Sequence, residues 1–385
     1  MRRLLLPISA CCLVFLTTAC APPARERFFW PPPPEQPQVE YIGVYRSSNE
    51  MTSGAAKALM SVTGGTEQLP LNQPTAIVAD DHGKVFVSDS EFNKILLFDF
   101  VKKSYGDYIT EGLKKPFGLD IDSKGNLYVV ERKGAVVKVF SPERALLRSF
   151  GAGQLKEPIR VAVDDERGRI YVSDLMDHQV KVFSLDGQFI RFLGDENGFR
   201  SEADGEFNRP NGVTVDAAGN LYVCDQLNAR IQVFDPTGAF IRKFGIRGDT
   251  LNTFEAPTGL TFDNAGRLWI TDLRKGALLT YSVGTDPQYL FATYGPTDTF
   301  GRYNLRSPMD ISIDKNSRIY VADSLGDRIS VWQILDAPYL SEHPLPADWL
   351  QRTDIIDRWY RESGETPPPK EGAAVAPAPA VKKTP

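Results

Sequence analysis

Hydrophobic and polar residues follow one order that recurs six times in the middle of the chain. Each copy places an apolar run after a proline, ends it in aspartate, and then turns, in five copies at glycine. A second run, rich in Val, Ile and Tyr, ends in Asp or Glu, and a third ends in an aromatic residue. Short runs of β-branched and aromatic residues between turn residues predict strands. The copies span 71–98, 113–140, 155–183, 207–234, 254–281 and 305–332.

A fourth strand is predicted after each of the first five copies, at 103–110, 145–151, 187–194, 238–245 and 287–295. The sixth copy is followed by the proline-broken segment 336–346, but residues 39–46 (VEYIGVYR) have the missing pattern. We therefore predict an all-β fold, a six-bladed β-propeller whose N-terminal strand completes the last blade, because an open ring would leave a long unpaired edge. Beyond the ring, Trp349, Ile356, Trp359 and Tyr360 lie near one face of a predicted short C-terminal helix within 346–364.

Two carboxylates recur at fixed places in every copy, and both sets are predicted to be structural. A side chain repeated in every blade is expected to accept hydrogen bonds from backbone N–H groups in its turn. The first set is Asp80, Asp122, Asp164, Asp216, Asp263 and Asp314, and the second is Asp89, Glu131, Asp174, Asp225, Asp272 and Asp323.

The first twenty residues have the pattern of a bacterial export signal. Arg2 and Arg3 precede an apolar run over 4–16, which is too short to span a bilayer. The sequence Thr-Thr-Ala-Cys that ends at Cys20 resembles the lipobox of bacterial lipoproteins, which implies lipidation of Cys20; a plain secretory signal is the alternative. Ala21 is not the aspartate that retains many such lipoproteins at the inner membrane, so the resemblance implies the outer membrane.

Composition changes along the chain predict five segments. They are a signal peptide (1–19), a Pro-rich tether (20–38), the propeller (39–335), an extension with a helix (336–364) and a disordered Pro/Ala/Lys tail (365–385). The tether contains Phe-Phe-Trp before a run of prolines. These aromatics are expected to pack on the ring, or alternatively to bind a partner.

Charge and cysteine content restrict the function further. Removal of residues 1–19 leaves 42 basic and 49 acidic residues, a net charge of −7, which argues against a nucleic-acid partner. Once Cys20 is acylated, Cys224 is the single remaining cysteine, so no disulfide is expected. No haem-attachment motif or other cofactor motif is present, and no cofactor is predicted.

The repeated motif resembles the NHL repeat. It reads Pro-x-Gly, then hydrophobic-Asp-x-x-Gly-Asn/Arg-hydrophobic-Tyr-Val-x-Asp, then Asn-x-Arg-Ile-x-Val-Phe, most clearly in PNGVTVDAAGNLYVCDQLNARIQVF at 210–234. With the signal, the chain resembles bacterial six-bladed NHL-repeat lipoproteins over about residues 39–335. The resemblance implies the fold but little of the function, because this fold serves enzymes, sensors and scaffolds.

In related propellers ligands meet the face where the inner strands begin. The second residue of each inner strand is small in four blades (Ala76, Gly118, Gly212 and Gly259), whereas Arg160 and Asp310 occupy this place in blades three and six. These two blades oppose each other, so a cation and an anion are predicted at the channel mouth, where they would bind a polar or zwitterionic ligand. The ligand-binding candidates are Arg160, Asp310, Asn211, Thr75, Thr258 and Phe117.

The residues of a known enzymatic centre are not evident in the sequence. Asp310 and Asn211 are too few oxygen ligands for a calcium site, and His82, His178 and His343 are not expected to meet around zinc. No nucleophile elbow or ordered triad stands out. We therefore predict no metal site and no catalytic residue.

The loops between the second and third strands carry the predicted partner-binding residues. Blades two and five have basic loops that oppose each other across the ring, and apolar residues occupy the same loops in other blades. The candidates are Arg132, Lys133, Arg274, Lys275, Leu175, Met176, Leu227, Leu273 and Leu325. The sequence thus predicts a lipid-anchored propeller of the cell envelope that binds an envelope protein without catalysis. The alternative is a small-molecule sensor or a hydrolase- or lyase-like enzyme that uses the channel mouth.

Overall fold

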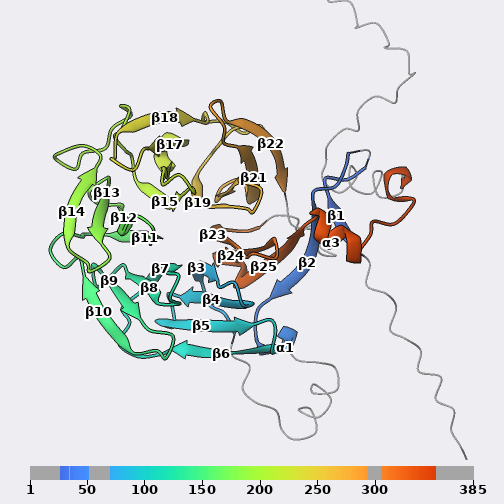
Figure 1. The fold of residues 1–385 in the computed structure, drawn as a ribbon, viewed down its shortest axis with the longest axis horizontal. Coiled ribbons are helices and arrows are strands. Elements are labelled where there is room, and N and C mark those ends of the chain that lie inside the picture. Colours follow the sequence, from blue (N-terminus) through green and yellow to red (C-terminus); the bar gives the residue numbers. More distant parts are fainter. Residues whose placement is uncertain (1–26, 34, 52–69, 294–304, 353–385) are drawn as a thin grey trace, which may run out of the picture.

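The computed structural model describes residues 27–33, 35–51, 70–293 and 305–352, which form six antiparallel sheets arranged around a central axis (Figure 1). Five sheets have four strands and the sixth has five. Neighbouring innermost strands contact one another around the whole ring, in the order β3, β7, β11, β15, β19, β23 and back to β3. The predicted six-bladed β-propeller is therefore confirmed.

The strands fall within the six repeats in the expected order. Blade one contains β3 (Pro74–Ala79), β4 (Lys84–Asp89), β5 (Lys94–Asp99) and β6 (Ser104–Ile109). Blade two contains β7 (Pro116–Ile121), β8 (Leu127–Glu131), β9 (Val136–Phe140) and β10 (Leu146–Phe150). Blade three contains β11 (Pro158–Asp164), β12 (Arg169–Asp174), β13 (Gln179–Ser184) and β14 (Phe189–Leu193). Blade four contains β15 (Pro210–Val215), β16 (Leu221–Asp225), β17 (Arg230–Phe234) and β18 (Phe240–Phe244). Blade five contains β19 (Pro257–Phe262), β20 (Leu268–Asp272), β21 (Ala277–Ser282) and β22 (Gln288–Thr293). Blade six contains β23 (Pro308–Ile313), β24 (Arg318–Asp323) and β25 (Arg328–Ile334), followed outward by β2 (Val39–Tyr45) and β1 (Phe28–Trp30).

The hydrophobic core lies between blades. One cluster joins Ile231 and Val233 of blade four to Leu268 and Ile270 of blade five, and similar clusters fill the other gaps. Because successive side chains of a strand point to opposite faces of its sheet, each middle strand contributes apolar residues to two neighbouring gaps. The repeated apolar runs of the sequence are thereby explained.

The ring closes through the N-terminal strand, as predicted. Strand β2 pairs with β25, with Val39 opposite Ile334 and Tyr45 opposite Ile329. Strand β1 was predicted only as part of the tether, with its aromatics packed on the ring. It adds a fifth strand to β2, and Phe29 is buried against Trp349, with ring centroids 4.8 Å apart.

Polar contacts secure the same closure. Arg27 donates two hydrogen bonds to the carboxylate of Glu40, and the hydroxyl of Tyr339 donates to that carboxylate at 2.9 Å. The outer edge of blade six thus joins segments from both ends of the described chain.

Helical structure is sparse in the described residues. Helix α3 (Ala337–Glu342) follows the ring and begins at Asp336, whose carboxylate accepts from the backbone N–H of Tyr339. It lies before the predicted helical segment 346–364, of which the structure shows only the short 3-10 turn η3 (Trp349–Gln351); residues 353–364 lie outside the described residues. The other short elements are α1 (Ser48–Met51), η1 (Gln226–Asn228) and η2 (Ser324–Gly326). No helix within the described ranges has the length and apolar character needed to cross a membrane.

The repeated carboxylates are structural, as predicted. In the first set, Asp80 accepts from the backbone N–H groups of His82 and Lys84, both at 2.8 Å, which fixes the turn between two strands. In the second set the carboxylates are buried and also accept from the segment that enters the blade. Asn72 N–H donates to Asp89 at 2.7 Å, and Ser307 N–H donates to Asp323 at 2.8 Å.

Candidate functional site

The inner strands approach one another closely at the channel mouth. A Cβ atom on Gly118 would lie 2.6 Å from the carbonyl oxygen of Ile159, and one on Gly259 would lie 2.7 Å from the Cα of Asp310. Atoms of the neighbouring backbone cannot yield that much space. The small residues at these positions are therefore required by the ring, as the sequence suggested.

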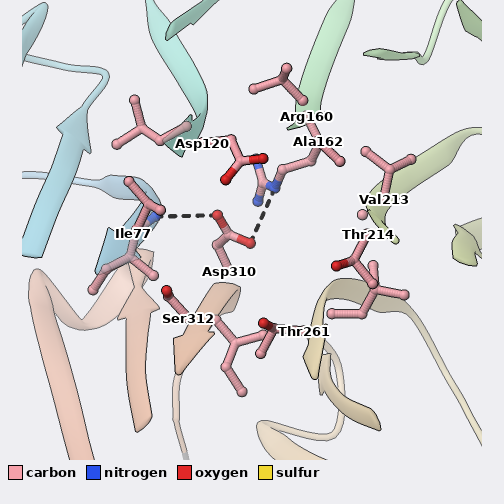
Figure 2. A pocket seen from close by; sticks show the side chains of 15 residues that line it. Ile77, Asp120, Arg160, Ala162, Val213, Thr214, Thr261, Asp310 and Ser312 are labelled. Carbon is pink, nitrogen blue, oxygen red and sulfur yellow. Dashed lines mark hydrogen bonds and ion pairs between the residues drawn. The ribbon is translucent and has the colours of Figure 1, made fainter. Parts of the chain in front are cut away.

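Arg160 and Asp310 face each other across the channel, as predicted, and they interact directly (Figure 2). The Nε atom of Arg160 lies 3.5 Å from Oδ1 of Asp310, and its Nη2 donates to the carbonyl oxygen of Met309 at 2.5 Å. The two residues are 3% and 7% exposed. Burial lowers the pKa of the Arg160 guanidinium and raises the pKa of the Asp310 carboxyl, while the opposite charge of each partner acts against the shift. A ligand at this place would have to displace Arg160 from blade six.

Three of the remaining mouth candidates serve contacts within the ring. The hydroxyl of Thr75 donates to the carbonyl of Pro116, and that of Thr258 donates to the carbonyl of Pro308, so both threonines join neighbouring blades. Phe117 packs with Ile159, Leu175 and Met309. These residues come from blades two, three and six, and the guanidinium carbon of Arg160 lies 5.5 Å from the centroid of the Phe117 ring.

Asn211 has a different environment. It is buried, and its Oδ1 has no hydrogen-bond partner among the described residues. A buried amide oxygen without a partner is unfavourable, so this atom remains the predicted mouth residue best able to accept a hydrogen bond from a ligand or water.

Asp120 belongs to the channel and was not among the predicted site residues. It lies beside Arg160 and Asp310, and its Oδ2 accepts from the backbone N–H of Val163 at 2.7 Å (Figure 2). It lines the channel cavity, where burial, followed by the nearby charge of Asp310, raises its pKa to about 7. The signal was available in the sequence, because Asp120 interrupts the apolar inner strand in GLDID.

Three channel side chains hydrogen-bond to the next blade, at the junctions of blade six with blade one and of blade two with blade three. Asp310 accepts from the N–H of Ile77, and Ser312 accepts from the N–H of Ala79, both in blade one. Asp120 of blade two accepts from the N–H of Val163 in blade three. They satisfy donors on the innermost strand edges, which have no further strand to pair with. Together with Thr214 and Thr261 they surround a cavity of about 80 Å³, which has room for two or three water molecules.

The structure gives no grouping of side chains suited to a metal centre in the ranges that it describes. Groups of three or more His, Cys, Asp and Glu side chains in ligand geometry are absent from these residues. His82 lies in a turn on the face opposite the mouth, His178 accepts the backbone N–H of Arg209 at 3.0 Å, and His343 stacks on Tyr339. Cys224 is buried, and burial raises the pKa of its thiol, while Cys20 lies outside the described residues.

Two of the four basic loop candidates form hydrogen bonds within the protein, and two are exposed to solvent. Arg132 donates to Glu157, and Lys275 donates to the carbonyl of Thr250 at 2.6 Å. Lys133 and Arg274 are exposed. The predicted pair of basic loops is therefore reduced to one exposed cation on each side of the ring.

The apolar loop candidates also differ in their exposure to solvent. Leu175 is buried in the cluster at the mouth and Leu273 is partly buried, whereas Met176, Leu227 and Leu325 are 59%, 43% and 63% exposed. Two further residues of this face, Phe199 and Ile246, are 68% and 69% exposed. They were missed because they lie in the connections between blades, outside the repeated motif.

Comparison with known proteins supports the repeat type. The family model of the NHL repeat matches residues 207–234. Peptidyl-glycine alpha-amidating monooxygenase B of Xenopus laevis is 29% identical over 276 residues, which cover 65% of this chain but 30% of that protein. Protein brain tumor of Drosophila melanogaster is 28% identical over 149 residues, covering 37% of this chain and 14% of that protein.

Solved structures show the same architecture at low sequence identity. A streptogramin B lyase superposes with a TM-score of 0.54 at 15% identity, covering 69% of this chain and 95% of that chain. A protein of unknown function from Bacteroides thetaiotaomicron gives a TM-score of 0.56 at 17% identity, covering 69% and 70%. At these identities the likeness shows the fold alone. The chain is therefore a six-bladed β-propeller in which residues 207–234 match the NHL repeat.

Proposed function

We propose that this propeller is a non-catalytic binding module of the bacterial cell envelope, anchored by lipid at Cys20, which docks a protein partner. The docking surface is the loop face, defined as the face formed by the loops between second and third strands and by the connections between blades. The observation that carries the proposal is the exposure of Met176, Phe199, Leu227 and Ile246 on this face. Large exposed apolar residues gathered on one face are typical of protein interaction sites.

The loop face is held in place by hydrogen bonds. Arg247 donates to the carbonyl oxygen of Leu227, and Asn228 donates to the carbonyl oxygen of Ser201 at 2.7 Å. These contacts tie the two long connections to the loop of blade four. The apolar side chains are therefore presented on ordered backbone, which lowers the entropy lost when a partner binds.

Substitution of the apolar residues on the loop face should remove the partner. We expect a Met176→Asp/Leu227→Asp/Ile246→Asp variant to recover its specific partner from cross-linked native membranes at about one tenth of the wild-type yield or less, because buried apolar anchors dominate binding. Quantitative mass spectrometry of the affinity-purified protein measures this ratio. The matched control is Phe189→Asp on the outer strand β14, which is 42% exposed but away from the loop face. An identical set of recovered proteins for wild type, triple variant and control would contradict the docking proposal.

The lipid anchor has a separate test. Replacing Cys20 with serine removes the thiol that would be acylated, so the variant is expected to move from the membrane fraction to the soluble fraction after export. Immunoblotting of the separated fractions measures this distribution. If the Cys20→Ser protein stays in the membrane fraction as fully as wild type, the anchor proposal fails while the docking proposal still stands.

A further inference from the structure

A cleft of about 770 Å³ lies between blades one and two, on the face opposite the loop face. This turn face carries the turns between first and second strands and between third and fourth strands. The cleft volume falls within the range of about 300–1,000 Å³ that is usual for small-molecule sites. It is about ten times the volume of the channel cavity, and neither the repeat motif nor the loop face accounts for it.

The cleft lies beside a place on the outer strand of blade one where each of the next three blades has an arginine. Arg148, Arg191 and Arg242 occupy equivalent places on the outer strands, each paired with the residue before the aromatic end of the third strand. Arg191 and Arg242 reach carbonyl groups in the following blade, at Pro236 and Val283. In blade one the equivalent residue, opposite Leu97, is Gly106, and a Cβ atom added there would meet no atom within 4 Å.

The turn of the next blade that faces this place on the outer strand also differs between blades. In blades three and four the turn between third and fourth strands has Gly187 and Gly238, and a Cβ atom at Gly238 would lie 2.6 Å from Nη2 of Arg191. Blade two has Arg144 at this place, in the same left-handed conformation with φ of 71°. Between blades three and four, arginine lies on the outer strand and glycine on the turn of the next blade. Between blades one and two the order is reversed, with Gly106 on the strand and Arg144 on the turn.

Basic side chains outnumber the free carboxylates around the cleft. Lys84, Lys124 and Arg144 make no ion pair with another described residue, and Lys102 lies 3.8 Å from Asp99. Of the four acids that line the cleft, Asp80, Asp99 and Asp122 each accept backbone N–H groups of their own turns, whereas the exposed Asp81 is a free carboxylate at the rim. The charge of these three acids is compensated by turn donors, so Lys84, Lys124 and Arg144 face one free carboxylate, Asp81, and remain available to a ligand.

The base of the cleft is apolar and aromatic. Phe86, Leu97 and Ile121 line it, and the ring of Tyr108 packs edge-on against Phe86 at 4.8 Å. The guanidinium of Arg144 lies 4.9 Å from the centroid of the Tyr108 ring. An apolar base beneath a basic rim matches a molecule with an anionic end and a hydrocarbon or aromatic body.

We propose that this cleft binds an amphiphilic anion, with a phosphate or carboxylate head at Lys124 and Arg144 and an apolar body over Phe86 and Ile121. The site is independent of the docking surface, because it lies on the opposite face and between different blades. The same head-group chemistry is offered by a soluble amphiphile and by an anionic lipid.

Titration with n-octyl phosphate, followed by isothermal calorimetry of the whole folded protein, tests the proposal. Wild type is expected to bind one molecule, and Arg144→Gly to bind at least about tenfold more weakly, since a charge-assisted hydrogen bond is lost. Gly106→Arg restores the arginine of the next three blades and should abolish binding by filling the cleft, although it adds a cation. Lys315→Ala, an exposed cation on the turn face of blade six, is the control that should bind like wild type.

Flotation with phosphatidylcholine vesicles that contain phosphatidic acid separates the two sources. Flotation that depends on Arg144 identifies a lipid head group, and octyl phosphate binding without flotation identifies a soluble amphiphile; either result supports the site. The proposal is overturned if wild type binds neither probe, or if Gly106→Arg binds octyl phosphate as tightly as wild type. The second result would show attraction to surface charge rather than occupation of the cleft.

Discussion

Replacing Asp310 with alanine is expected to destabilise the folded propeller by about 3–5 kcal/mol, because the change leaves the buried charge of Arg160 without a counter-charge. The substitution also removes the acceptor of the Ile77 N–H group, which faces the channel. Urea-induced unfolding, followed by circular dichroism, measures the change in the free energy of unfolding. The variant should unfold at a clearly lower urea concentration than wild type.

Removing both charges together should cost far less than removing one. An Arg160→Leu/Asp310→Ala double variant is expected to regain most of the loss, since an ion pair buried in the interior contributes little net stability relative to apolar side chains. If Asp310→Ala alone has the small effect of a surface substitution, the guanidinium is solvated and the cross-channel pair does not close the mouth. In that case the channel mouth becomes the better candidate for ligand binding.

Stability should fall as the pH rises toward neutrality, and Asp120 should account for much of the fall. Its pKa of about 7 in the folded protein exceeds the ordinary value, so the folded state binds more protons than the unfolded state between these two values. The carboxyl therefore favours folding below the ordinary pKa, and this contribution is lost as the pH rises to 7, by at most about 4 kcal/mol. The pKa of Asp310 shifts in the same direction, and the charge of Arg160 limits that shift.

The variant Asp120→Asn isolates this contribution. Asparagine has no proton to lose and keeps one of the two oxygens that accept from the N–H groups of Ile121 and Val163. The stability of the variant relative to wild type should therefore rise between pH 4 and pH 8. Melting temperatures across this pH range give the comparison. The assignment is wrong if wild type and Asp120→Asn have parallel profiles.

The repeat made the ring predictable from the sequence alone. Six prolines, twelve carboxylates and six aromatic strand ends fix the blades, and the lone strand at 39–46 could be assigned to blade six because β25 otherwise lacks an outer neighbour. Such features recur, so each copy supports the interpretation of the others. Strand β1 and helix α3 have no counterpart in other blades, and their places depend on packing against β2 and Trp349.

The candidate site was less predictable than the fold, because it depends on side-chain conformations and not on the spacing of residues in the repeat. Arg160 and Asp310 could be placed in opposing blades, but whether the guanidinium spans the channel depends on a side-chain conformation that spacing does not determine. Asp120 lies near the end of β7, whereas the predicted ligand-binding residues all lie at the starts of inner strands. Gly106 illustrates the converse, since its importance lies in an absent side chain and becomes visible only once the strand registers are known.

The pairing of β2 with β25 also determines when the protein can complete its folding. The segment around Val39 leaves the ribosome, or an export channel, long before its partner around Ile334, so blade six stays incomplete until nearly the whole ring has emerged. Contacts of such high sequence separation form slowly. During that interval β2 has no partner strand and its edge stays open, which is the state most prone to association with other chains. Quality control of this protein is therefore expected to act on the last blade rather than on the first.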